Sequence, residues 1–482
     1  MSHFVLVVKY FLCFRSAGAM TGLCSRRILR LRLQYSRYWF MLVPTVALIL
    51  FIFSVGGGFS FPCTLMTCHS EESLPSPDQK RNGELSSLSD LNGIEICLSI
   101  KFVEPIQPLE LTGSPQLGTK GPYVVVYNYL KSSKFYAINE TVTFTTHSTP
   151  EFMNNVGTIA ERWDGPVSVA LFVPSTDFCR TLHRLIFLRN CDKAAYREKV
   201  TWHLYWPKDS PPPSSWSLVP DETQVECEKL ANDYRHNIDL KQTWRAVNHL
   251  SYPINVGRNV ARQASTTWFV LPSDVELFPS IGLAPQFMNF ISHQSNNLKM
   301  PPRLNKDPPR RVYVVPVFEV KEILPNKKEE LIIQLARNSA VYFHRLVCPH
   351  CQRFPGIRKW ITEIGTPGQI HAMSWTQRVP PYHRWEPIFV CSPREPLYDE
   401  LLSWDGLQDK MTQMHELCLL GYEFVILDRA FLVHAPGIKR PTRRSSRNSE
   451  RDAFVKENAR IYEQVVTMLD TKYGANTKCP HH

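Results

Sequence analysis

The sequence lacks the cysteine and histidine spacing of zinc fingers and contains no RNA-binding motif. Its first 37 residues also lack any acidic residue while containing seven Lys and Arg residues, so this segment carries +7 of the net charge of +11. The rest of the chain is therefore close to neutral. These absences argue against a nucleic-acid partner, although the chain as a whole is basic.

Charged residues are absent from residues 39–61. An uncharged stretch of this length spans about 35 Å as a helix, enough for a hydrocarbon core of roughly 30 Å. The basic flank precedes it and Glu71 and Glu72 follow it, which places the N-terminus in the cytosol. A cleaved signal peptide is the alternative, but residues 60–62 form a poor cleavage site. We predict a cytosolic tail (1–38) and a transmembrane signal-anchor (39–61) of type II topology.

Residues 62–115 are rich in Ser, Pro, Glu and Asp and show no apolar periodicity, which predicts a flexible stem. A sequon at Asn139 predicts N-glycosylation on the lumenal side. Eleven of the 13 cysteines follow the anchor, so at least one of them stays unpaired if the others form intramolecular disulfides. The pairing itself cannot be deduced from the sequence.

From residue 116 onward, strand and helix patterns alternate, and no internal repeat is found. This alternation predicts one α/β domain over residues 116–482, with a mostly parallel, mixed and covered sheet. In such sheets ligands bind beyond the carboxyl ends of the strands. The strand patterns cover residues 123–129, 167–173, 268–271, 311–320 and 424–427, and the helix patterns cover residues 152–163, 255–264, 411–418 and 454–469.

Two carboxylates, Asp274 and Glu276, follow the apolar strand pattern at 268–271. In an extended chain the i, i+2 spacing points both side chains to the same side. Two hard oxygen ligands there suit Mn²⁺ or Mg²⁺ bound against a diphosphate. The pair alone is weak support, because such pairs are also common at solvated strand ends.

A polar stripe precedes this pair on a predicted helix. Asn255, Arg258, Asn259 and Arg262 recur at three- and four-residue spacing and therefore share one helical face. The stripe is either a solvated face or a surface that contacts nucleotide phosphates and hydroxyls, with Arg providing a bidentate fork. We take Asn255, Arg258, Asn259 and Asp274 as donor-binding candidates.

Taken together, these segments resemble glycosyltransferase family 49, a family that includes β-1,4-glucuronyltransferases and the glucuronyltransferase domain of the LARGE enzymes. The resemblance covers about residues 120–440, in order. The matching segments are residues 160–172, YPINVGRNVAR at 252–262, DVELFPSIGL at 274–283, residues 312–320, Trp385-Glu386-Pro387, residues 398–400 and Phe431-Leu432-Val433-His434.

The resemblance implies a GT-A-like nucleotide-sugar-binding fold, Mn²⁺ (with Mg²⁺ as an alternative) and a UDP-sugar donor, by analogy UDP-glucuronic acid. It further implies an inverting transfer, β-1,4 to xylose on an O-mannosyl glycan of a glycoprotein, by an enzyme of the Golgi membrane with a lumenal catalytic domain. Two alternatives stay open. They are transfer of another sugar, such as N-acetylglucosamine, and a glycan-binding protein that has lost catalysis.

The site residues carried over from the resemblance are the metal ligands Asp274 and Glu276, with His434 as a further metal or diphosphate contact. Glu276 stands where the best-known members have Asp, and this departure motivates the inactive alternative. Inversion needs a general base. Asp409, Glu386 and Asp399 are the candidates, and Asp409 stands where those members tend to have Asn.

Two remaining motifs have more than one interpretation. Cys348 and Cys351 with His350 between them could form half of a zinc site, but no second pair with suitable spacing exists and family members have a similar pair, which favours a disulfide. The basic segment 439–447 is either a solvated connector or a surface that attracts an anionic donor or glycan.

Overall fold

A computed structural model of the chain describes residues 116–213, 227–228, 242–297, 310–363, 365, 367–434, 437–440 and 449–481. All of them belong to one unit, Gly83–His482. The predicted tail, anchor and stem lie outside the described residues. Within the described ranges, no helix has both the length and the apolar character that a membrane span requires.

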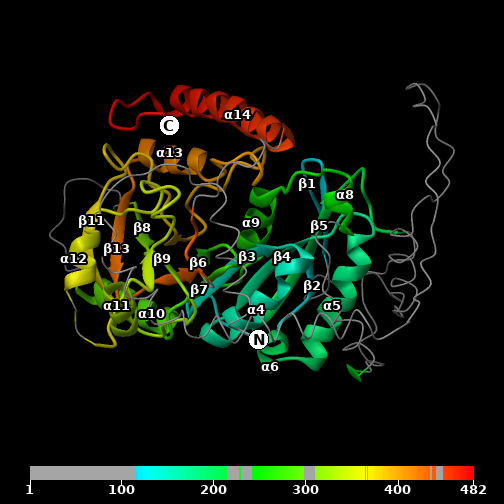
Figure 1. The fold of residues 1–482 in the computed structure, drawn as a ribbon, viewed down its shortest axis with the longest axis horizontal. Helices are drawn as coiled ribbons and strands as arrows, with labels where there is room; N and C mark the ends of the chain where they lie inside the picture. The colour runs from blue at the N-terminus through cyan, green and yellow to red at the C-terminus, as the bar shows by residue number, and fades with distance from the viewer. Residues whose placement is uncertain are drawn as a thin grey trace, which may run out of the picture. The chain divides into compact units, whose positions relative to one another are not determined.

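A six-stranded sheet forms the first half of the fold, in the order β1-β2-β5-β4-β3-β6 (Figure 1). Strands β5, β4, β3 and β6 pair in parallel, and β1 and β2 continue the sheet in antiparallel pairing. The predicted strands at 123–129, 167–173 and 268–271 are confirmed. The strand bounds are β1 Gln116–Lys120, β2 Tyr123–Leu130, β3 Val142–Ser148, β4 Val167–Phe172, β5 Val200–Pro207 and β6 Phe269–Pro272.

Helices cover both faces of this sheet, which explains why β4 has apolar side chains on both of its faces. Val169 and Leu171 lie in the core formed with α4 (Met153–Arg162) and α5 (Asp177–Cys191). Ala170 and Phe172 face the opposite way, into the cluster formed with α9 (Ile254–Gln263). The short elements on this half are η2 (Pro150–Phe152), α6 (Ala194–Lys199) and α8 (Trp244–Val247).

Two four-stranded sheets form the second half, in the orders β10-β9-β14-β7 and β11-β13-β8-β12. In each, the central pair is parallel and both edge strands are antiparallel. The single mostly parallel sheet that we predict is therefore confirmed only for β5-β4-β3-β6. The bounds are β7 Leu277–Pro279, β8 Arg311–Val314, β9 Val317–Val320, β10 Ala340–Tyr342, β11 His371–Thr376, β12 Phe389–Val390, β13 Glu423–Asp428 and β14 Leu432–His434.

The strand predicted over residues 311–320 is wrong as one element. It breaks between Val314 and Val317 into β8 and β9, which belong to different sheets. Pro316 explains the break, because proline has no N–H with which to continue a ladder. Its carbonyl is still used, and accepts a hydrogen bond from the Leu432 N–H at 2.9 Å.

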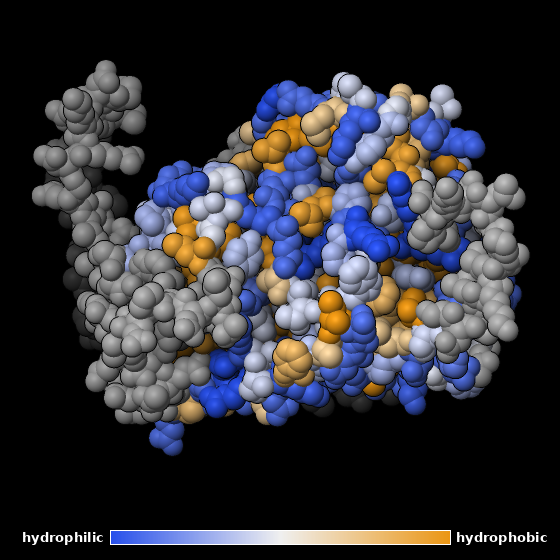
Figure 2. Space-filling view, turned by 180° about the vertical axis from the view of Figure 1, so that it is seen from behind, coloured by the Kyte–Doolittle hydropathy of each residue, from blue (hydrophilic) through white to orange (hydrophobic). Residues whose placement is uncertain are grey.

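The remaining helices are α10 to α14, of which α13 and α14 run side by side at one end of the molecule (Figure 1). Gly421, at φ +71°, follows the end of α13. On the face shown in Figure 2, hydrophobic side chains occur in small groups between hydrophilic ones. The bounds are α10 Leu283–Asn297, α11 Lys328–Ala336, α12 Ile357–Thr362, α13 Met411–Leu419 and α14 Ser449–Tyr473.

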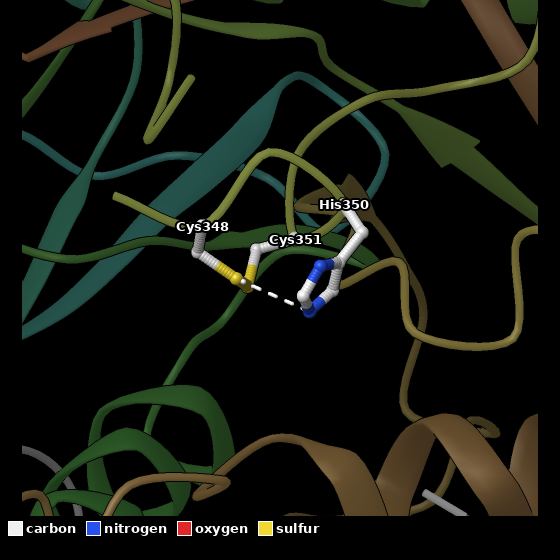
Figure 3. A group of neighbouring side chains, drawn as sticks. All are labelled: Cys348, His350 and Cys351. Carbon is white, nitrogen blue, oxygen red and sulfur yellow. Dashed lines mark hydrogen bonds between the residues drawn. A yellow bond between two sulfur atoms is a disulfide. The ribbon is translucent and has the colours of Figure 1, made fainter. Parts of the chain in front are cut away.

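Disulfides join Cys191 to Cys227, Cys348 to Cys351, and Cys418 to Cys479. The pair in the CPHC motif is therefore a disulfide, as predicted, and Figure 3 shows the His350 ring against it, with Nε2 3.4 Å from the Cys348 sulfur. Oxidised sulfurs are not thiolate ligands, so the zinc alternative fails here. Cys391 is free and buried, which fits the odd cysteine count.

Candidate active site

Asp274 lies at the carboxyl edge of the large sheet, just beyond the end of β6. Its parallel neighbour β3 ends beside it, and this brings His147 to the same edge. The Asp274 carboxylate accepts from Arg258 Nη2 at 2.8 Å and from Lys410 Nζ at 3.2 Å, and His147 Nε2 lies 3.4 Å away. This is the edge at which ligands bind in parallel sheets.

The charges around Asp274 fix its ionisation state. Burial opposes ionisation, but the cations Lys410 and Arg258 outweigh burial and hold the pKa of Asp274 well below its usual range. Burial lowers the pKa of His147, whose other nitrogen bonds to the Tyr252 hydroxyl at 2.8 Å. Asp274 is therefore an anion at neutral pH, with 27% of its side chain open to solvent.

The extended geometry expected for residues 274–276 is not found. The Leu277 N–H donates to the Asp274 carbonyl at 3.0 Å and closes a turn between β6 and β7. The two carboxylates consequently differ in their surroundings. Asp274 faces the cations, whereas the Glu276 side chain is 44% exposed and lies toward β14.

His434 reaches the same turn because β14 pairs with β7, with His434 opposite Leu277. Its Nε2 lies 3.9 Å from Glu276 Oε1. The ring is buried, and neither of its nitrogens has a hydrogen-bond partner among the described residues. Burial lowers the pKa of His434 to about 4, so the imidazole is neutral at pH 7. A neutral, buried imidazole with free lone pairs is suited to binding a metal.

The three predicted metal ligands therefore lie around one turn, but they are not drawn together into a closed cluster. Within the part of the chain that the structure describes, only two other groups bring three ligand atoms within 4.8 Å of one another, Cys348-His350-Cys351 and His415-Asp470-His481. The residues at the turn nevertheless fit a hard divalent cation: two carboxylates with solvent access and one unpartnered imidazole.

The polar stripe of α9 is buried, which excludes the solvated-face alternative. Both N–H groups of the Asn255 amide are used by the carbonyls of Asp399 and Asp409, each at 2.7 Å. The Asn259 amide bonds to the Tyr398 carbonyl and to Glu400, each at 2.8 Å. Asn255 and Asn259 therefore hold the 398–409 segment in place. Because these bonds use the N–H groups of both side-chain amides, neither amide has a free N–H group for the predicted contact with the donor.

Arg262 and Arg258 complete the stripe in different ways. Arg262 donates to three carbonyls of residues 392–396, so it too holds this loop. Arg258 bridges Asp274 and Asp409. The Arg258 guanidinium thereby fixes the position of the Asp274 carboxylate relative to Asp409.

The three base candidates have different environments. Burial raises the pKa of Glu386 to about 7, and Lys410 and Asp409 are among the charges that act on it. Burial alone would raise the pKa of Asp409, but Arg258 and Lys410 outweigh it and the pKa is lowered. Burial raises the pKa of Asp399, which accepts from the Leu401 N–H at 2.9 Å. Glu386 alone combines a pKa near neutrality with proximity to the Asp274 cluster.

Several residues at this site were given no role from the sequence. Lys410 was visible only as the neighbour of Asp409, and His147 lies on β3, which none of the predicted strand patterns covers. His344 lies near His434 and Lys439, with a pKa lowered by burial to about 4. Lys439, from the basic segment 439–447, acts electrostatically on both Glu276 and His434.

Comparison with known proteins agrees with this geometry. A family described as "Glycosyl-transferase for dystroglycan" matches residues 141–474. β-1,4-Glucuronyltransferase 1 of Danio rerio is 25% identical over 378 residues, covering 74% of this chain and 81% of the relative. The Homo sapiens protein of that name is 25% identical over 368 residues with the same coverage. LARGE2s of Gallus gallus, a xylosyl- and glucuronyltransferase, is 28% identical over 188 residues, covering 38% of this chain and 23% of the relative.

The family match extends over more than half of the chain and includes Asp274, Glu276, Glu386, Asp409 and His434. The site that joins these residues lies at the carboxyl edge of a parallel sheet, where ligands bind in α/β proteins. The chain therefore belongs to glycosyltransferase family 49 and is a glycosyltransferase.

Proposed function

We propose that this enzyme transfers glucuronic acid from UDP-glucuronic acid to a glycan acceptor, β-1,4 to xylose on an O-mannosyl glycan, with inversion at the sugar. The names of its relatives support the donor sugar. The observation that carries the proposal is that His434, from far along the chain, lies at the turn that holds Asp274 and Glu276, near a carboxyl group of pKa about 7. The arrangement of the sheets and the site fits a GT-A-like fold.

Asp274, Glu276 and His434 would hold Mn²⁺, or Mg²⁺ in its place. When bound there, the ion supplies positive charge that stabilises the departing diphosphate. Lys410 and Lys439 add fixed positive charge on the two sides of the turn, since Lys410 bonds to Asp274 and Lys439 acts on Glu276. These two lysines are suited to the phosphates of the donor as point charges.

Glu386 is the general base in this proposal. An inverting transfer requires a group that takes the proton of the acceptor hydroxyl while that oxygen attacks the sugar carbon. A base works best when its pKa is close to the operating pH, and burial brings Glu386 to about 7. Asp409, whose carboxylate is bonded to Arg258 and whose pKa is lowered, is instead a partner of that guanidinium.

We further propose a Golgi location with the catalytic domain in the lumen, anchored by residues 39–61. Three disulfides in the described residues support an oxidising compartment. Asn139 is exposed, as an attached glycan requires.

The test is donor turnover by the purified full-length chain. UDP release is measured with UDP-glucuronic acid and with UDP-N-acetylglucosamine, each with a β-xyloside acceptor, in Mn²⁺ and in EDTA. We expect Mn²⁺-dependent turnover of UDP-glucuronic acid that Asp274→Asn abolishes and that the exposed control Glu322→Gln retains. Preferential turnover of UDP-N-acetylglucosamine would refute the donor assignment, and full activity of Asp274→Asn would refute the site.

A further inference from the structure

A second group of metal-binding side chains lies away from the candidate active site, where α13, α14 and the segment after α14 meet (Figure 1). His415 is on α13, Asp470 is on α14, and His481 follows α14. One ligand atom from each residue lies within 4.8 Å of the other two. This group contains neither a residue of the Asp274 turn nor one of the base candidates.

The Asp470 carboxylate is shared between the two rings. His415 Nε2 lies 2.9 Å from Asp470 Oδ1, and His481 Nε2 lies 2.6 Å from Asp470 Oδ2. The rings meet edge to face with their centroids 5.2 Å apart. Both Nε2 atoms therefore point at one carboxylate.

The position of this group is fixed by covalent structure. The disulfide between Cys418 and Cys479 ties the segment after α14 to α13. His415 lies one helical turn before Cys418 on the same face of α13, and His481 lies two residues after Cys479. The Tyr473 hydroxyl donates to Glu416 at 2.7 Å and adds a further link between the two helices. The ligands are thus held near one another before any ion binds.

We infer that His415, Asp470 and His481 bind a zinc ion, which links α13 to α14 and to the segment that follows it. Two imidazoles and one carboxylate are a ligand set that Zn²⁺ takes in proteins, with a fourth position left to water. In the hydrogen-bonded arrangement each Nε2–H donates to Asp470. On metal binding each ring would carry its hydrogen on Nδ1 and present the Nε2 lone pair to the ion.

Access and charge are consistent with such a site. The side chains of Asp470 and His481 are 19% and 41% exposed, whereas that of His415 is 2% exposed. An ion can therefore enter from solvent and meet a buried ligand on the inner side. The Asp470 carboxylate supplies negative charge toward a divalent cation.

The inferred ion would act on the active site indirectly, in part through α13. This helix begins at Met411, directly after Lys410, which contacts Asp274. Holding α13 against α14 therefore steadies the segment that delivers Lys410 and Asp409. The inferred role is to link these segments, and its test does not depend on the proposed reaction.

The experiment is zinc titration of the full-length chain, produced without a histidine tag and stripped with EDTA, followed by calorimetry. His481→Ala and Asp470→Asn are compared with the exposed control His293→Ala on α10. His434→Ala is included to identify zinc bound at the Asp274 turn. We expect His293→Ala and His434→Ala to bind one equivalent of zinc with the wild-type affinity. His481→Ala and Asp470→Asn should bind this zinc ion at least about tenfold more weakly.

Two further readouts keep the inference testable if Asp470→Asn folds poorly. His481 is the most exposed of the three ligands, so His481→Ala should melt like the wild type in EDTA, while zinc should raise the melting temperature of the wild type only. Co²⁺ should give the visible absorption of a four-coordinate ion in the wild type and not in His481→Ala. Equal zinc stoichiometry and affinity in wild type and His481→Ala, or no binding by the wild type below about 100 µM, would overturn the inference.

Discussion

Replacement of Glu386 by Gln tests catalysis and stability with one substitution. The amide keeps the size of the side chain and removes its charge. As the proposed base, Glu386 contributes typically about 10²–10⁴-fold to the rate. We expect kcat of Glu386→Gln to fall by that order at pH 8. In the wild type kcat/KM should rise with pH to a plateau above about 7, because the base acts only when it is ionised.

The stability effect has the opposite sign. Burial raises the pKa of Glu386 from 4.5 to about 7, so the folded chain binds more protons than the unfolded chain between these values. Stability therefore falls as pH rises through this window, and the penalty is complete above pH 7. The raised pKa corresponds to about 3 kcal/mol at most, which partial solvent access reduces to about 1–2 kcal/mol.

Glu386→Gln should consequently be more stable than the wild type at pH 8 and similar to it at pH 5. Urea unfolding at the two pH values measures this difference, and initial rates from pH 5.5 to 8.5 measure the base. Glu322→Gln, an exposed substitution of the same kind, should change neither quantity. Asp399→Asn distinguishes between the base candidates and should retain most activity. A Glu386→Gln variant with wild-type kcat at pH 8 would refute the assignment.

Three other substitutions test the surroundings of the site. His434→Ala should weaken Mn²⁺ binding by about tenfold or more, as measured by titration of Mn²⁺ into the full-length chain, and the exposed control His371→Ala should not. Arg258→Gln leaves two carboxylates without their guanidinium and should lower the free energy of unfolding by about 3–5 kcal/mol in urea titration; a loss below 1 kcal/mol would contradict its bridging role. Gly257→Ala places a Cβ 2.6 Å from the Tyr205 hydroxyl and should cost about 1–3 kcal/mol in thermal unfolding.

Local patterns predicted the elements that depend on local properties. The strand at 123–129, the buried strand at 167–173 and the helix at 411–418 follow from side-chain periodicity and apolar runs. The break at Pro316 was also readable from the missing N–H, yet the continuous apolar run concealed it. The turn at 274–276 was not readable, since Asp-x-Glu fits either an extended or a turned backbone.

The partners of the α9 stripe could not be predicted, because they come from far along the chain. Asn255 is 154 residues from Asp409, and Arg262 is 130 residues from Ser392. Three- and four-residue spacing identifies a helical face but does not tell which segment covers that face. The same spacing is expected for a solvated helix, for a phosphate-binding helix and for the buried clamp that the structure contains.

The Asp at position 409 has a physical explanation in this arrangement. Arg258 is buried between Asp274 and Asp409, so its charge has two carboxylate partners. A neutral Asn at 409 would leave Asp274 as the only counterion of Arg258, while Lys410 also bonds to Asp274. Asp274 would then face two cations and attract a metal less strongly, since opposite charges are already close to it. By taking part of the Arg258 charge, Asp409 leaves more of the Asp274 carboxylate for a divalent ion, and this function requires Asp409 to stay ionised rather than to accept a proton.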